Sequence, residues 1–158
     1  MKKNTKSGRE GANTVGQVGL GIMGGAYSKH LRQAGFAVAG FDLDSSRRAA
    51  LKKLGGTAER SIADVGAKVS VIITSLPSIA AVQSAFFGAG GILESAKPGT
   101  IVIETSTLPL EVKLELRDRS ATRRITVLDC PISGTGAQAA VKDISVYASG
   151  PEGAVRKC

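Results

Sequence analysis

Five short apolar segments recur along the chain, and a glycine, proline or polar turn follows each of them. They span residues 15–19, 37–41, 69–74, 100–103 and 125–128. Short apolar runs bounded by turn residues are typical of buried strands. The almost unbroken run 69–74 is expected where helices cover both faces of a parallel strand. The pattern therefore predicts several buried, parallel strands.

Between these strands, apolar residues return at helical spacing among charged ones. We expect helices over residues 25–34, 46–54 and 110–119, a short Ser61-capped turn of helix, and a helix capped by Ser78. Parallel strands that alternate with helices form βαβ units. The chain should therefore be an α/β domain, with a Rossmann-type, doubly wound and mostly parallel sheet that carries helices on both faces.

The first strand runs directly into a glycine-rich turn. Gly19, Gly21 and Gly24 have the spacing G-x-G-x-x-G. The first glycine permits the turn, the second lets a pyrophosphate approach the backbone, and the third packs helix against strand. With 20 glycines in the chain the spacing alone is a weak signal. The flanking strand and helix, with Asp42 about 20 residues on, favour a dinucleotide site over a turn that binds nothing.

Asp42 stands at the carboxyl end of the second strand. Its carboxylate can accept hydrogen bonds from the adenosine ribose hydroxyls, and a 2′-phosphate would meet that negative charge at close range. NAD is therefore the expected cofactor. Arg47 or Arg48 could still reach such a phosphate, so NADP remains the less favoured alternative.

The sequence of this turn resembles the cofactor loop of the β-hydroxyacid dehydrogenases, the family of 3-hydroxyisobutyrate dehydrogenase and tartronate semialdehyde reductase. Later segments support the resemblance, because they match the family's motifs in order and at similar spacing. The matching segments are Gly19-Leu20-Gly21-Ile22-Met23-Gly24, Ser75-Leu76-Pro77, Glu104-Thr105-Ser106-Thr107 and Leu128-Asp129-Cys130-Pro131-Ile132-Ser133-Gly134. The resemblance runs from about Val15 to Gly150.

The resemblance also implies site residues. The substrate carboxylate would be held by Ser133 and Gly134, next to Thr135 in place of the family's usual second glycine, which should reshape the acid pocket. The residues alone leave an alternative open, in which Pro77 only ends a strand and Ser106 or Thr107 caps the next helix. The implied cofactor contacts are Gly19, Leu20, Gly21, Ile22, Met23, Gly24, Asp42, Leu76, Pro77 and Thr107.

The implied reaction is NAD-dependent oxidation of a small hydroxy acid, or the reverse reduction. In the family, a lysine just beyond the Rossmann domain moves the hydroxyl proton, and an all-helical domain closes the site and builds the dimer. Lys142 precedes an expected last strand at 144–148 and does not match that lysine. We assign no catalytic residue and expect this chain alone to be inactive. The alternatives are a non-catalytic dinucleotide-binding module, or an imine-reductase-like or phosphogluconate-dehydrogenase-like relative.

The expected organisation follows from the same reading. Residues 1–14 should form a flexible basic tail, 15–150 the dinucleotide-binding Rossmann domain, and 151–158 the start of a truncated connection to an absent helical domain. The length of 158 residues, with 42% hydrophobic and 22% charged residues, suits one globular domain with a real core. The full-length protein should be a homo-oligomer.

Charge, hydropathy and cysteine content limit the classes of binding partner and the cellular location that we expect. The net charge of +8 comes from scattered basic residues, and with only 4% aromatic residues a nucleic-acid partner is not expected. The apolar runs are far shorter than a membrane span, and no secretory signal follows the basic start. Cys130 and Cys158 are too few for a disulfide framework and favour a cytoplasmic protein without a metal site. His30, the only histidine, is expected to be a surface or packing residue.

Overall fold

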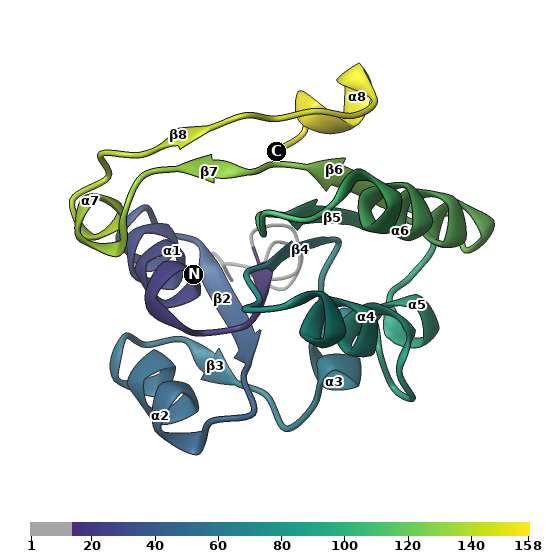
Figure 1. Cartoon of the computed structure of the whole chain (residues 1–158). Helices are drawn as coiled ribbons and strands as arrows, with labels where there is room; N and C mark the ends of the chain where they lie inside the picture. The colour runs from purple at the N-terminus through teal and green to yellow at the C-terminus, as the bar shows by residue number, and fades with distance from the viewer. Residues whose placement is uncertain (1–13) are drawn as a thin grey trace, which may run out of the picture.

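A computed structural model describes residues 14–158. Its centre is a six-stranded, entirely parallel sheet in the order β3-β2-β1-β4-β5-β6 (Figure 1). This order confirms the doubly wound Rossmann fold, with the winding direction changing between β1 and β4. The predicted tail lies outside the described residues, apart from Thr14, which begins β1. The strands are β1 (Thr14–Val18), β2 (Ala37–Phe41), β3 (Thr57–Ala58), β4 (Val71–Thr74), β5 (Ile101–Glu104) and β6 (Thr126–Asp129).

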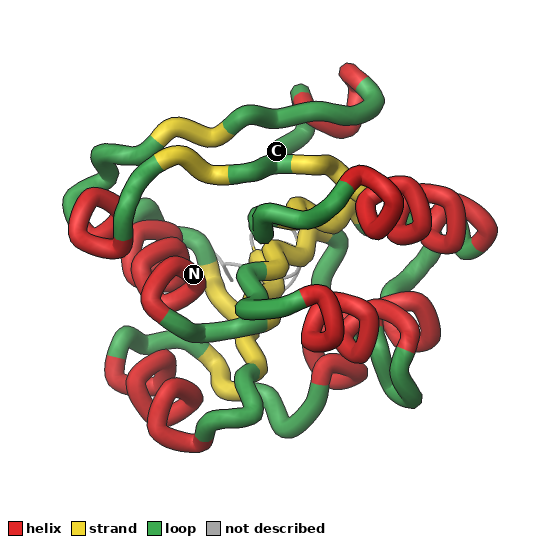
Figure 2. The backbone as a smooth tube through the Cα atoms, viewed as in Figure 1, coloured by secondary structure: helices red, strands yellow, loops and turns green. Residues whose placement is uncertain are grey.

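Helices cover both faces of the sheet (Figure 2). One face carries α1 (Ile22–Gln33) and α2 (Ser45–Lys53), which enclose a small core around Leu20, Val38 and Leu51. The main core lies on the other face, where apolar side chains from four helices meet the strands. Those helices are α3 (Ile62–Gly66), α4 (Ile79–Phe87), α5 (Ile92–Ser95) and α6 (Leu110–Thr122).

Local capping signals predicted several helix starts. Ser61 accepts a hydrogen bond from the Asp64 N–H at the start of α3, and Ser78 caps α4 in the same way. Asp44 caps α2. The predicted start of α1 at residue 25 was wrong. The helix begins at Ile22, because Gly21 adopts an extended N-cap conformation inside the glycine motif. The glycine motif therefore supplies the helix N-terminus itself.

Residues 130–149 leave the parallel sheet and form a separate unit, called the arm below. It contains β7 (Ile132–Ser133), α7 (Gly136–Ala140) and β8 (Ser145–Val146), and β7 pairs antiparallel with β8 (Figure 1). The strand expected over residues 144–148 is thus reduced to β8 and pairs within the arm. Because α7 reverses the chain direction, β8 pairs with β7 rather than with a strand of the parallel sheet.

The chain then returns to the sheet through α8 (Glu152–Val155). Ala154 and Val155 pack against Ile101, Leu128 and Cys130, and so cover the ends of β5 and β6 on the face opposite the main core. Among residues 14–158, no helix is both long enough and apolar enough to cross a membrane.

Candidate functional site

Two glycines of the motif are fixed by backbone contacts. Gly19 has φ +87°, and a Cβ atom there would lie 2.2 Å from the carbonyl oxygen of Ser75. At Gly24, an added Cβ would lie 1.9 Å from the carbonyl oxygen of Gly19. Real atoms do not approach so closely, so a side chain at Gly19 must displace the loop after β4, and one at Gly24 must push α1 away from β1. Gly19 therefore lets the turn lie against the Ser75 backbone, and Gly24 lets the helix pack closely against the strand.

Gly21 differs, because its missing side chain leaves space in front of the helix. The nearest atom to an added Cβ is a guanidinium nitrogen of Arg47, at 3.5 Å. Gly21 is the N-cap of α1, has no side chain to cap the helix, and no acidic residue occupies the first turn. The first N–H groups of α1 therefore face this space, which suits the pyrophosphate of a dinucleotide.

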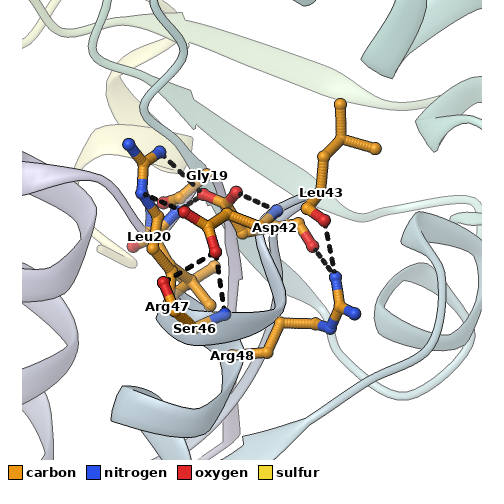
Figure 3. Close-up of polar contacts among 9 residues, drawn as sticks. Gly19, Leu20, Asp42, Leu43, Ser46, Arg47 and Arg48 are labelled. Carbon is orange, nitrogen blue, oxygen red and sulfur yellow. Dashed lines mark hydrogen bonds and ion pairs between the residues drawn. The ribbon is translucent and has the colours of Figure 1, made fainter.

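Asp42 lies directly beside this turn, at the end of β2, and is 9% exposed (Figure 3). Its Oδ2 accepts a hydrogen bond from the Leu20 N–H at 2.7 Å, and its Oδ1 accepts one from the Asp44 N–H at 2.9 Å. The sequence predicted the place of Asp42 but missed its bond to Leu20. That bond holds the turn and the carboxylate in one arrangement, with the carboxylate at the position that receives a ribose in Rossmann domains.

Two arginines approach Asp42 in different ways (Figure 3). Arg48 donates to the backbone carbonyls of Asp42 and Leu43 and lies over the Phe41 ring, so its guanidinium is committed to local structure. Arg47 is 51% exposed and forms ion pairs with Asp42 at 3.4 Å and with Asp44 at 3.6 Å. Arg47 is therefore the cation nearest the open space at Gly21.

The loops after β4 and β5 are joined by hydrogen bonds. The Leu76 N–H donates to the Ser106 hydroxyl at 3.2 Å, and the Ser106 N–H donates to the Glu104 carboxylate at 2.9 Å. The capping role considered for Ser106 and Thr107 is wrong, because Pro109 is the N-cap of α6 and no side chain caps it. The Ser106 hydroxyl instead holds the Leu76 loop. Pro77 and Thr107 are exposed at this edge, and their cofactor contacts stay predictions.

The arm places Ser133 and Gly134 as exposed residues, and α7 leads back to the glycine turn. An added Cβ at Gly136 would lie 2.2 Å from the Cγ2 of Ile22, so the start of α7 is packed against the start of α1. Thr135 caps α7 and forms a capping box with Gln138. The residue that departs from the family motif therefore has a structural role that the sequence reading missed.

Glu104 is the most unusual carboxyl group near this edge, because it is only 2% exposed. Burial raises the pKa of Glu104, and this effect outweighs the opposing hydrogen bonds from Ser106 and the charge of Lys113. A carboxyl group with a raised pKa in the folded state favours folding below its unfolded pKa, and this contribution is lost as the pH rises through the folded pKa.

A Glu104→Gln variant should therefore lose less thermal stability than the wild type as the pH rises. The amide keeps an oxygen that can accept from the Ser106 N–H but carries no charge to desolvate. Melting temperatures between about pH 5 and pH 8 would measure this slope, with the exposed Glu111→Gln as control. A Glu104→Gln slope equal to that of the wild type and the control would contradict the expectation.

Within residues 14–158, no group of three or more His, Cys, Asp or Glu side chains could hold a metal ion. The candidate binding features gather instead at the carboxyl end of the parallel strands. There the structure brings together the glycine turn, Asp42, the Leu76 loop and the start of the arm. In an open α/β sheet this edge, at the point where the winding reverses, is where ligands bind.

Comparison with known proteins agrees with this geometry. The chain is 32% identical over 141 residues to the probable mitochondrial 3-hydroxyisobutyrate dehydrogenase of Dictyostelium discoideum, with 89% of this chain and 44% of that protein covered. It is 31% identical over 140 residues to the NAD-dependent L-serine dehydrogenase of Pseudomonas aeruginosa, with 89% and 47% covered. The chain spans about half the length of the curated relatives it matches.

Solved structures share the fold. The 3-hydroxyisobutyrate dehydrogenase of Mycobacterium tuberculosis, determined with L-serine, superposes with a TM-score of 0.85 at 29% identity, covering 92% of this chain and 49% of that one. The family model for the NAD binding domain of 6-phosphogluconate dehydrogenase matches residues 14–158. The chain therefore belongs to the family of NAD-binding domains typified by that of 6-phosphogluconate dehydrogenase, and NAD is its cofactor.

Proposed function

We propose that this chain provides the cofactor domain, and part of the acid site, of an NAD-dependent dehydrogenase of small hydroxy acids of the 3-hydroxyisobutyrate type. The observation that carries the proposal is the packing of α7 against Ile22 of the cofactor turn, because α7 begins just two residues after Gly134. A substrate held by the arm would then lie at the same sheet edge as the cofactor. Bound NAD supplies the acceptor for the substrate's hydride.

The residues of the chain bind and orient both ligands. The first N–H groups of α1 hold the pyrophosphate, and Asp42 accepts from the adenosine ribose. Leu43 is 89% exposed beside Asp42 and provides an apolar surface for the adenine. The Leu76-Pro77 loop and Thr107 flank the cofactor. The hydroxyl of Ser133 and the N–H of Gly134 hold the substrate carboxylate, as in the family motif.

We also propose a preference for NAD over NADP, and substitution of Asp42 tests it. In an Asp42→Asn variant the amide oxygen can still accept from the Leu20 N–H, whereas the bond from the Asp44 N–H is lost and the negative charge that repels a 2′-phosphate is gone. We expect the ratio of NADP to NAD dissociation constants to fall by about tenfold or more. Calorimetric titrations with each cofactor measure that ratio.

The control for this experiment is Asp44→Asn, because Asp44 is next to the site and also pairs with Arg47 but caps α2. The control should bind both cofactors with nearly the wild-type ratio. A second variant, Asp42→Ala, should also weaken NAD, because the ribose loses its acceptor. Unchanged selectivity in both Asp42 variants would show that another group selects the cofactor.

We base proposals for the cellular location and the oligomeric state on the two cysteines and on exposed apolar side chains. Cys130 is buried with a pKa raised by that burial, and Cys158 is exposed; both are free thiols, which supports a reducing, cytoplasmic location. The outer side of the arm exposes Val141, Val146 and Tyr147 at 72%, 52% and 62%. Exposed apolar residues in one segment support an association surface, as a homo-oligomer requires.

A further inference from the structure

The single histidine of the chain joins the cofactor helix to the arm. His30, on α1, places its Nε2 atom 2.9 Å from the carbonyl oxygen of Ala139, on α7. The two residues are 109 positions apart in sequence. The other ring nitrogen, Nδ1, lies 3.2 Å from the Oε1 atom of Gln33. A neutral imidazole has one N–H, and two acceptors face this ring, so the shorter contact to Ala139 is the one assigned that proton.

A second contact accompanies this one between α1 and α7, which lie side by side in Figure 1. At the other point, Gly136 at the start of α7 packs against Ile22 at the start of α1. The two contacts lie near opposite ends of both helices. Together they fix the direction of α7 along α1, and with it the position of the residues that precede α7 in the arm.

The chemistry of the contact assigns its donor. A backbone carbonyl can only accept, so Nε2 must carry a proton and donate to Ala139. Helix α7 has only five residues, and its last carbonyl groups lack partners inside the helix. The Ala139 carbonyl accepts from the Lys142 N–H at 3.2 Å, at the end of the helix, as well as from His30. Such a short helix is marginal alone, so an external donor stabilises it.

We propose that His30 is a positioning residue that holds α7 on the cofactor helix and thereby fixes Ser133 and Gly134 relative to the glycine turn. The inference rests on the proposed function, because that function gives Ser133 and Gly134 their role with the substrate. His30 acts through the Ala139 carbonyl and not on the cofactor. Its loss should loosen the arm and leave the cofactor turn intact.

Backbone hydrogen exchange in two variants tests the donor role. His30→Leu removes the donor but keeps an apolar side chain, whereas His30→Gln keeps an N–H group that can reach the carbonyl. We expect amides of residues 136–143 to exchange about tenfold faster in His30→Leu, and within about threefold of the wild type in His30→Gln. The exposed neighbour Lys29→Ala is the matched control. NAD affinity should stay close to the wild-type value in all three variants.

Each outcome decides the proposal. Wild-type exchange in His30→Leu, or equally fast exchange in His30→Gln and His30→Leu, would mean that the ring does not act as a donor. If exchange rose throughout the parallel sheet, the wild-type protein would supply the test. His30 is the only histidine, so the ¹⁵N chemical shifts of its one imidazole ring report which nitrogen carries the proton. A ring without a proton on Nε2 would overturn the proposal.

A final experiment distinguishes failure of this inference from failure of the proposed function. With NAD bound, 3-hydroxyisobutyrate should slow exchange around residues 132–136 in the wild type and in His30→Gln but not in His30→Leu. Failure of the acid to protect the wild type would count against the proposed substrate class. Equal protection in all three proteins would count against His30 as a positioning residue.

Discussion

A Gly21→Val protein should fold with nearly wild-type stability and lose NAD binding. The backbone of Gly21 has φ −64° and ψ −161°, which a valine can adopt, and an added Cβ meets only the Arg47 guanidinium at 3.5 Å. The new side chain instead fills the space before the N-terminus of α1. Because the pyrophosphate needs that space, we expect affinity to fall by about 100-fold or more, which corresponds to about 2.7 kcal/mol.

Calorimetry with NAD and a thermal melt of the same sample measure the two halves of this expectation. Gly153→Val is the control, because a Cβ at Gly153 meets nothing within 4 Å and the residue lies in α8, away from the turn. That control should bind NAD normally. Tight NAD binding by Gly21→Val would refute the assignment of the pyrophosphate to this turn.

Gly24→Ala should have the opposite profile, with a large loss of stability from a single methyl group. The new Cβ would lie 1.9 Å from the Gly19 carbonyl oxygen and 2.9 Å from the Gln17 amide nitrogen, which itself donates to that carbonyl. A clash with backbone cannot be relieved by a side-chain rotation, so α1 must move away from β1. We expect a loss of about 3 kcal/mol or more in the free energy of unfolding.

Urea unfolding followed by circular dichroism measures this loss, and Gly21→Ala is the comparison within the same motif. Gly21→Ala should unfold at nearly the wild-type urea concentration. Since the whole stability of a domain is only about 5–15 kcal/mol, Gly24→Ala should be visibly less stable. A midpoint equal to that of the wild type would show that α1 can shift at little cost.

These two glycines show what the sequence could predict. The G-x-G-x-x-G spacing between a strand and a helix gave the turn and the place of Asp42, because both depend on residues near each other in sequence. The caps at Ser61 and Ser78 were predicted for the same reason. The spacing also assigned pyrophosphate approach to Gly21 and close packing to Gly24, but which atoms an added Cβ would meet at each position depends on the fold.

The arm contains most of the contacts that the sequence did not predict. The pairing of β7 with β8 and the contact of His30 with Ala139 join residues whose proximity no local pattern encodes. Thr135 was expected to alter the acid pocket, and the structure shows it capping α7. Thr107 was chosen over Ser106, although Ser106 makes the bond to the Leu76 loop. A hydroxyl at the end of a strand can serve either role, and only the fold decides which.

The strands of the arm form a sheet of their own, and this has a consequence for how such proteins diverge in evolution. Its strands pair with each other, and its ends join the parallel sheet through the antiparallel Asp129–Ser149 pair and the bond from the Cys130 N–H to the Glu104 carbonyl. Residues between these anchors contribute no pairing to the six central strands, and α7 touches the helix layer of that sheet at α1. The half of the site that we propose to bind the acid can therefore acquire new substrates over evolution while the nucleotide-binding half is inherited intact.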